Sequence, residues 1–357
     1  MKSYDIAGIR ENSLINGFDW YSLNCFVKVK CILSECIAKN SAYLYLLFMD
    51  ENGWFLNEDK PMEHERFLEK ITKINFKTIV GNSNNFAKNL KRHIKNRDYI
   101  ILCSDNINRM GTEAYRKHHH EHFMILKGYD PQTDQFIVID EDLSKEYYKP
   151  VNCTNGVAYF KQRIDTAYLK ELCCIDYSNI SGFEDIGKNR YACIKAEFDP
   201  GCADEIDMEI LKVMYRENIE QTLAKLPDFM NRFKNDVIRL KEEHDFIHAR
   251  YFLDNPEYFK AWIVFPGKAN SISRHFFSIY TQNRFFYLKM EESARKSALM
   301  SAFAEVIDGY FRIRNTMLKC LITDDKDKYD LNINYLDEIF PKEQSIYNLI
   351  LENTSIL

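Results

Sequence analysis

The hydrophobic pattern of the chain changes near Ile175, and this change restricts its possible folds more than any other feature. Before this point, short segments alternate between a period of two, typical of strands, and a period near 3.6, typical of helices. After it, long stretches with helical periodicity dominate. We therefore predict an α+β domain over 1–176 and a mainly helical domain over 177–357 that covers the site of the first.

The expected elements follow from the same periods. In the first part we expect helices at 24–37, 63–74, 85–95 and 164–172, and strands at 42–49, 75–80, 98–103, 122–127 and 136–140. Turn-forming residues around Pro131 predict that the last two strands form a hairpin. In the second part we expect a linker at 177–190 and helices at 205–226, 228–248, 294–321 and 335–351.

Composition excludes several classes of function. The 357 residues carry 48 basic and 53 acidic side chains, and the net charge of −5 disfavours a general nucleic-acid binder. No run approaches the roughly 18 apolar residues of a membrane span. The first ten residues contain no apolar run of signal-peptide length. The ten cysteines form no CxxC pair, so we expect no cysteine zinc site. Without a signal peptide, we expect them to be reduced thiols in a cytoplasmic protein. We expect no cofactor bound by the protein itself.

Cys25 is the cysteine best suited to act as a nucleophile. Ser22 or Asn24 can cap a helix whose first turn contains Cys25. The positive end of the helix dipole stabilises a thiolate, which is the nucleophilic form of cysteine. Helical steps from Cys25 follow an apolar stripe that faces the interior: Val29, Ile32, Leu33 and Cys36. A buried cysteine that serves only packing fits the same pattern.

His122 and Asp140 are expected to share one face of the hairpin. Because side chains alternate along a strand, His122 lies on the face of Met124, and Asp140 on the face of Val138. A hairpin that closes symmetrically about Pro131 puts His122 directly opposite Asp140, with Cβ atoms roughly 4.5 to 5.5 Å apart. The carboxylate would hold one imidazole nitrogen protonated and leave the other to accept a thiol proton. A histidine that only satisfies its hydrogen bonds at a strand start is the structural alternative.

The order of these features resembles the papain-like and C39-like cysteine peptidase fold. A cysteine on an early helix is followed by His-Phe-Met-Ile-Leu-Lys at 122–127 and by Phe-Ile-Val-Ile-Asp at 136–140. Over roughly residues 15–175 the chain is similar to a biosynthetic branch of that fold, the butirosin-type acyltransferases. The resemblance implies a papain-like N-terminal domain in which Cys25 is the nucleophile, His122 the base and Asp140 the orienting acid.

The resemblance also implies a reaction and its partners. Butirosin-type enzymes take an acyl group from the phosphopantetheine thioester of a carrier protein and transfer it to an amine. We therefore expect an acyl or peptidyl carrier protein as partner and a small amine, possibly a diamine, as acceptor. Related proteins serve nonribosomal antibiotic assembly, including polythioamide synthesis, and this is the pathway type that the resemblance implies.

The chain departs from that branch around the nucleophile and the acid. Phe26 follows the cysteine, where the branch has a small residue. Asp142 stands two positions after Asp140 and is a rival orienting acid. The expected oxyanion hole combines the backbone N–H of Cys25 with a side chain of Asn24, Ser22 or Tyr21.

Two other functions fit the same residues. A cysteine peptidase or amidase would hydrolyse a peptide or acyl precursor with Cys25, His122 and Asp140. An inactive relative would act as a binding protein, and the departures beside Cys25 leave this alternative open.

Further patterns suggest weaker sites. His118, His120 and His122 share a face if the segment is a strand, and zinc bound there would compete with Asp140 for His122. His244 and His248 are four positions apart on a helix but lack the HExxH order, so we interpret them as surface or interhelical groups.

A basic cluster on a short helix offers a candidate docking face. Its members are Lys88, Lys91, Arg92, Lys95 and Arg97. Carrier proteins are usually acidic and would complement it, whereas a solvated helix surface is the structural alternative.

Overall fold

The computed structural model describes residues 4–6, 25–39, 41, 69–110, 115–116, 119, 121–141, 159–179, 183–199, 205–246 and 294–352. By its contacts the chain divides into two compact units. The first consists of Met1–Leu46 and Met62–Ile206, and the second of Leu47–Pro61 and Asp207–Leu357. The expected boundary at 176/177 differs from this division because a strand beyond it, at 190–198, belongs to the sheet of the first unit.

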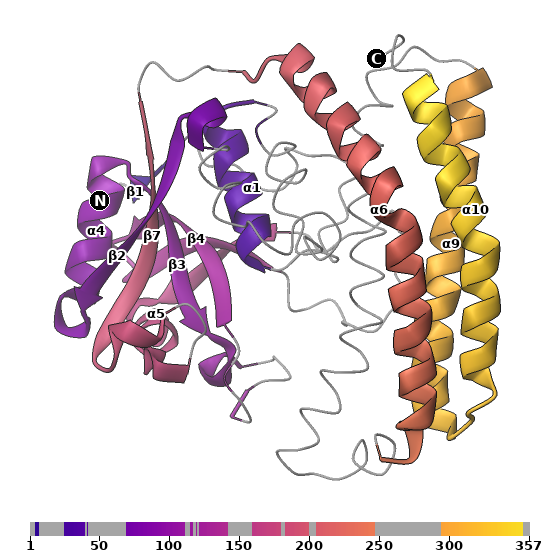
Figure 1. Cartoon of the computed structure of the whole chain (residues 1–357). Helices are drawn as coiled ribbons and strands as arrows, with labels where there is room; N and C mark the ends of the chain where they lie inside the picture. The colour runs from indigo at the N-terminus through magenta and orange to yellow at the C-terminus, as the bar shows by residue number, and fades with distance from the viewer. Residues whose placement is uncertain are drawn as a thin grey trace. The chain divides into compact units, whose positions relative to one another are not determined.

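The first unit contains one antiparallel sheet (Figure 1). Its strands are β1 (Tyr4–Asp5), β2 (Ile74–Asn82), β3 (Tyr99–Asp105), β4 (Glu121–Asp130), β5 (Gln135–Glu141), β6 (Tyr159–Asp165) and β7 (Arg190–Phe198). They lie in the order β2-β7-β3-β4-β5-β6, and β1 pairs with β4. The expected hairpin is formed by β4 and β5.

The sequence patterns predicted four of these strands, β2 to β5, and missed β1, β6 and β7. The expected strand at 42–49 lies outside the described residues. In β7, the residues from Tyr191 to Ile194 are all buried, so no alternation of apolar and polar residues marks it as a strand. β6 lies at one edge of the sheet and carries the charged residues Lys161 and Arg163, which hide its period.

Helices pack on both faces of the sheet. They are α1 (Cys25–Ile37), α4 (Phe86–Asn96) and α5 (Thr166–Cys173). α4 and α5 share one buried cluster with the side chains on one face of the sheet, including Met124 and Val138. α1 lies against the other face (Figure 1). There the rings of Phe26 on α1 and Phe123 on β4 have centroids 4.7 Å apart. The described elements of this unit therefore confirm a mixed α+β class with helices on two sides of a sheet.

The turn from α4 to β3 is held by a buried histidine and an ion pair. Nδ1 of His93 lies 2.7 Å from Oδ2 of Asp98, and Nζ of Lys195 lies 3.2 Å from Oδ1 of the same carboxylate. Burial raises the pKa of Asp98, but hydrogen bonds from His93 and Lys195 lower it more, so the pKa is below its ordinary value. The charged carboxylate therefore stabilises this turn.

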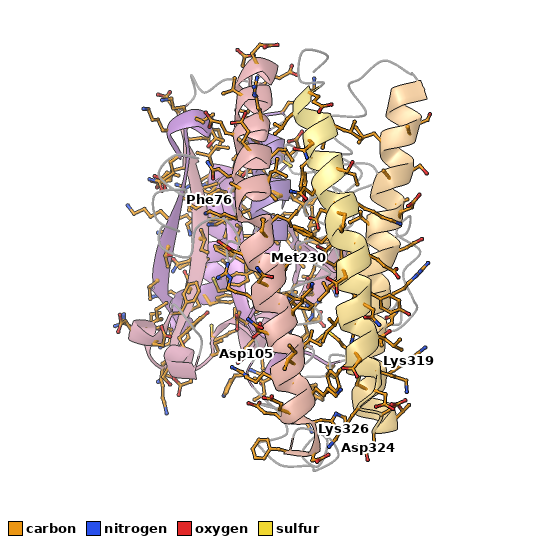
Figure 2. The ribbon with its side chains drawn as sticks, turned by 45° about the vertical axis from the view of Figure 1, so that its right-hand side comes forward. Phe76, Asp105, Met230, Lys319, Asp324 and Lys326 are labelled. Atoms are coloured by element: carbon orange, nitrogen blue, oxygen red, sulfur yellow. The ribbon has the colours of Figure 1, made fainter. Side chains whose placement is uncertain are left out.

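In its described part, the second unit consists of three long helices (Figure 2). They are α6 (Met208–Glu242), α9 (Ala294–Thr323) and α10 (Lys328–Glu352). This confirms a mainly helical C-terminal part. Among the described helices, none has the combination of length and apolar character that crossing a bilayer requires.

α6 is one continuous helix where the sequence pattern predicted two. Pro227 lies inside it, and a proline removes one backbone hydrogen bond of a helix. Buried side chains recur every three or four residues on both sides of this proline: Ile219, Thr222, Leu226, Met230, Phe233, Val237 and Leu240. The uninterrupted buried stripe explains why the helix continues through Pro227.

We predict that Asp98→Asn lowers the free energy of unfolding at neutral pH and reduces its dependence on acid. The folded-state pKa of Asp98 is below the unfolded value of about 3.9. The carboxylate therefore adds stability above that pH, and this stability is lost as the pH falls through the folded pKa. Urea unfolding at pH 7 and pH 3 should show a wild-type advantage that shrinks in acid. The exposed control Asp185→Asn should change little, and an advantage that grows in acid would contradict this account.

Candidate active site

The structure brings His122 and Asp140 together in the interior of the sheet. Nε2 of His122 lies 2.7 Å from Oδ1 of Asp140. The two residues are 3 % and 0 % exposed. His122 is the second residue of β4, and Asp140 is the second-last residue of β5, so both lie at one end of the hairpin.

The register of the hairpin differs from the symmetric one that we expected. Ile125 pairs with Ile139 and Leu126 with Val138, and the register shifts between Leu126 and Gly128. Relative to the expected register, β5 is displaced by two residues, so Asp140 lies diagonally across from His122. A displacement of two residues keeps every side chain on its original face, and diagonal neighbours in a sheet remain within reach of long side chains.

Arg109 is the third member of this buried cluster, and the sequence analysis did not identify it. Its Nη2 donates a hydrogen bond of 2.5 Å to Oδ2 of Asp140, and its Nη1 contacts Nε2 of His122. Arg109 is 5 % exposed and follows the short helix η4 (Asn106–Asn108). No local pattern distinguishes one arginine in the polar segment after β3 as a buried partner.

Asp140 and Arg109 make opposite demands on Nε2 of His122, and each demand corresponds to one tautomer of a neutral imidazole. A carboxylate oxygen only accepts hydrogen bonds, and a guanidinium only donates them. In a neutral His122, a protonated Nε2 can donate a hydrogen bond to Asp140, whereas an unprotonated Nε2 can accept one from Arg109. Donation from Nε2 to Asp140 leaves Nδ1 with the free lone pair of the ring. The guanidinium of Arg109 also compensates the charge of the Asp140 carboxylate.

The candidate nucleophile lies at the start of α1. Cys25 is the first residue of this helix, as expected, and its side chain lies outside the described residues. The next residue, Phe26, packs against Phe123, which follows His122 on β4. The start of α1 is therefore close to the start of β4. The oxyanion candidates at 21–24 and the rival acid Asp142 lie outside the described residues.

The imidazole of His122 and helix α1 belong to opposite faces of β4. Alternation places His122 on the face of Met124, which packs with α4 and α5. It places Phe123 on the other face, where Phe26 contacts it. A thiol from Cys25 would therefore have to meet this imidazole around the end of the sheet.

The cysteines of the described core are poorly suited to attack a substrate. Burial raises the pKa of Cys193 to about 12 and that of Cys174 to about 11, and it also raises the pKa of Cys31 and of Cys173. A thiol with such a pKa is almost entirely protonated near pH 7 and is a weak nucleophile. The described cysteines form no disulfide bond with one another.

The histidine tract does not form a shared metal site in its described part. Nδ1 of His119 lies 2.6 Å from Oδ2 of Asp105, whereas His122 is bound to Asp140. The two described histidines of the tract thus have different carboxylate partners. His118 and His120 lie outside the described residues.

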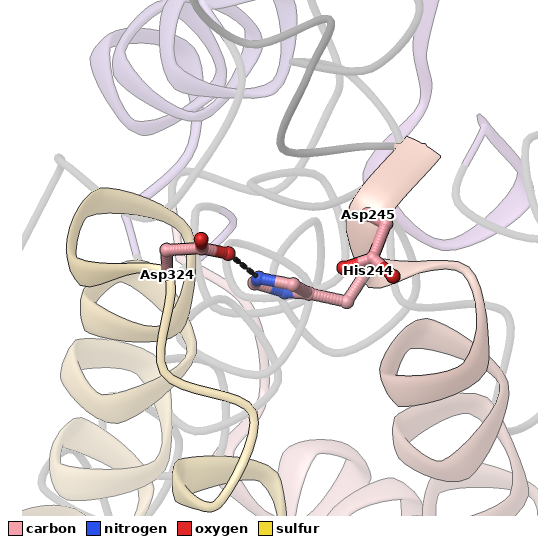
Figure 3. Close-up of side chains that lie close together, drawn as sticks. All are labelled: His244, Asp245 and Asp324. Atoms are coloured by element: carbon pink, nitrogen blue, oxygen red, sulfur yellow. Dashed lines mark hydrogen bonds and ion pairs between the residues drawn. The ribbon is translucent and has the colours of Figure 1, made fainter.

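A second cluster of possible metal ligands lies in the helical unit (Figure 3). His244 is buried near the C-terminal end of α6, with Nε2 2.8 Å from Oδ1 of Asp324 and Nδ1 3.1 Å from the hydroxyl of Tyr329. Asp245 completes a set whose ligand atoms lie within 4.8 Å of one another. Nζ of Lys326 already lies 2.7 Å from Asp245. Because each of the three possible ligands already has a partner in the protein, we interpret the cluster as a set of structural contacts that join the end of α6 to the turn between α9 and α10.

Comparison with known proteins does not assign the chain to a family, since it matches no family model and no curated protein. The function is therefore inferred from the geometry of His122, Asp140 and Arg109 and from the position of Cys25.

We predict that Arg109→Met strongly destabilises the first unit. Removing one partner of a buried ion pair leaves the other charge uncompensated, which typically costs about 3–5 kcal/mol. Arg163→Met is a matched control, because Arg163 makes a 2.5 Å contact with Asp130 but its side chain is 49 % exposed. Exposed pairs contribute about 1 kcal/mol or less. Urea unfolding at pH 7 compares the two variants, and equal losses would contradict a compensating role for Arg109.

Proposed function

We propose that this chain is a cysteine-dependent acyltransferase that forms an amide. Cys25 takes an acyl or peptidyl group from the thioester of a carrier protein and gives it to a small amine. The observation that carries the proposal is the buried 2.7 Å contact between His122 and Asp140, which are 18 positions apart in the chain. It is the base and orienting-acid pair that the resemblance to butirosin-type enzymes implies.

The proposed reaction has two steps. Nδ1 of His122 takes the thiol proton of Cys25, and the sulfur attacks the thioester carbonyl. The bond from this carbonyl to the phosphopantetheine sulfur breaks, and that sulfur leaves with the proton. A neutral amine then attacks the acyl-enzyme, loses its proton to His122, and Cys25 is released as the thiol. Exclusion of water during the second step separates transfer from hydrolysis.

The start of α1 would supply the oxyanion hole in this mechanism. The first N–H groups of a helix have no partner within the helix, and Cys25 is the first residue of α1. Its backbone N–H can therefore donate to the oxyanion that forms on the attacked carbonyl. A helix that carries the nucleophile, followed by an antiparallel sheet that carries base and acid, is the papain-like arrangement that we propose for 1–206. The carrier-protein donor implies a cytoplasmic enzyme of specialised, nonribosomal biosynthesis.

A second function is favoured by the position of α1 on the sheet. α1 packs against the face of Phe123, and Arg109 as well as Asp140 contacts Nε2 of His122. With these contacts, the cluster is a buried ion-pair network that stabilises the sheet. The chain would then be a binding protein without catalytic activity.

We predict that Cys25 forms an acyl adduct with an acylated carrier protein. Intact mass spectrometry should detect this adduct on the wild type and not on Cys25→Ala. Cys36→Ala is a matched control on the same helix, because Cys36 is partly exposed, and it should keep the adduct. Discharge by amines supports the transferase, and equally fast release in water alone identifies a peptidase or amidase. No adduct on any variant identifies the binding protein.

We also predict that Asp140→Asn slows formation of the adduct by roughly 100-fold or more, because the imidazole loses its orienting charge. Asp142→Asn should retain the wild-type rate. Because Asp140→Asn leaves Arg109 without its buried counter-charge, the double variant Asp140→Asn/Arg109→Met keeps the test valid if the single variant unfolds. Rapid quenching followed by mass spectrometry measures the rate. A wild-type rate in a folded Asp140 variant would assign the role of orienting acid elsewhere.

A further inference from the structure

The segment Ser83–Arg97, which contains α4, is strongly basic within an acidic chain. It holds five Lys or Arg residues and no Asp or Glu. Since the whole chain has a net charge of −5, the rest of the chain carries −10. This helix is therefore a local positive region in a field of the opposite sign.

Four of these cations form an exposed, unpaired row. Lys88, Arg92 and Lys95 follow one face of α4 at steps of four and three residues, and Arg97 is exposed just beyond its end. In the described part of the chain, none of the four side chains has an ion-pair or hydrogen-bond partner. Lys91 differs, because its ammonium group lies 2.8 Å from the hydroxyl of Tyr129. We call Lys88, Arg92, Lys95 and Arg97 the α4 basic face.

The α4 basic face opposes the stability of its own helix. Lys88 lies in the first turn, where the positive end of the helix dipole disfavours a cation. Lys88 and Arg92 are four residues apart and repel each other, as do Lys91 and Lys95. Only Lys95 and Arg97, near the C-terminal end, are placed favourably for the dipole. The stability of the helix therefore does not explain the positions of Lys88 and Arg92, which favours a role in recognition.

α4 begins at the end of the sheet that holds the candidate active site. Gly81 of β2 pairs with Tyr191 of β7, and Ser104 of β3 pairs with His122 of β4. The β3–β7 register, in which Leu102 pairs with Cys193, brings these pairs to the same level of the sheet. Since β2 ends at Asn82 and only the short helix η3 (Ser83–Asn85) separates it from α4, Lys88 lies on the side of the site.

We infer that the α4 basic face is the docking surface for the acidic carrier protein that delivers the acyl group. The inference rests on the proposed function and names the surface that its partner uses. Carboxylates spaced along one face of a partner helix would complement cations at steps of four and three residues. A nucleic acid is a poorer occupant, because four cations on a chain of net charge −5 neutralise few phosphates.

The test compares two charge reversals of the same size. Lys88→Glu/Lys95→Glu changes two exposed helical cations seven residues apart. Arg312→Glu/Lys319→Glu changes two exposed cations at the same spacing on α9, where Figure 2 labels Lys319. Both are made in the Cys25→Ala background, so that no chemistry interferes. The probe is an acidic acyl carrier protein with its phosphopantetheine arm and no acyl group, and the readout is its Kd by fluorescence anisotropy.

We expect the α4 variant to raise Kd about tenfold at roughly 0.05 M salt and the α9 control to stay within about twofold. The difference should largely vanish near 0.5 M salt, where exposed charges are screened. Lys88→Glu alone should bind more weakly yet melt no lower than the wild type, because the dipole and Arg92 favour a carboxylate there. Weaker binding accompanied by a lower melting temperature would indicate a structural role and overturn the inference.

Other outcomes separate this inference from the proposed function. The variant Lys88→Glu/Lys95→Glu is also made with Cys25 intact. If its Cys25 is acylated at the wild-type rate, the inference about the docking surface is overturned, and the proposal of an acyltransferase is not affected. Suppose that the wild type binds the carrier protein in a salt-sensitive way, that the α4 variant loses this binding, and that Cys25 of the wild type is never acylated. This result supports the docking surface and overturns the proposal of an acyltransferase. If the carrier protein does not bind the wild type, the inference about the docking surface is overturned. It is also overturned if the α4 variant loses affinity only for single-stranded RNA and not for the carrier protein.

Discussion

The carboxylate of Asp140 is buried in the sheet, and a buried charge must be compensated where it lies. Arg109 and His122 provide this compensation from two different segments of the chain. To reach Asp140, the segment after β3 must fold back over the end of the sheet. The backbone N–H of Met110 donates to the hydroxyl of Tyr168 on α5, which holds the segment in that position. The buried charge thus orders a polar segment and fixes the orientation of one imidazole.

The sheet itself divides the first unit into two environments. Its one face packs against α4 and α5 and contains His122 and Asp140, and its other face packs against α1. The rings of Phe26 and Phe123 bring the start of α1 to the start of β4, so the two environments come closest at that end of the sheet. Whether a thiol and an imidazole act together there distinguishes the acyltransferase from the binding protein. Both interpretations use the same buried cluster and differ only in the position of the sulfur.

Charges are used in two opposite ways in this protein. In the buried cluster each charge has a partner at hydrogen-bond distance, which is the condition for its burial. On α4 the cations of the α4 basic face are exposed and lack partners in the described part of the chain, and Lys88 and Arg92 oppose the stability of the helix that carries them. The first arrangement serves the fold, and it also creates the site. The second is not explained by the stability of the helix, and for that reason it is informative about partners.

The sequence by itself determined the local structure of α1, α4, β3 and the β4–β5 hairpin, because each has a clear apolar period over its own length. It also placed His122 and Asp140 on one face, since alternation survives any shift of register by two residues. The tertiary structure alone decided the actual register, with its shift between Leu126 and Gly128. It alone inserted β7 between β2 and β3 and brought Arg109 to Asp140. These features depend on contacts between distant segments, and a local period carries no information about which distant segment a residue will meet.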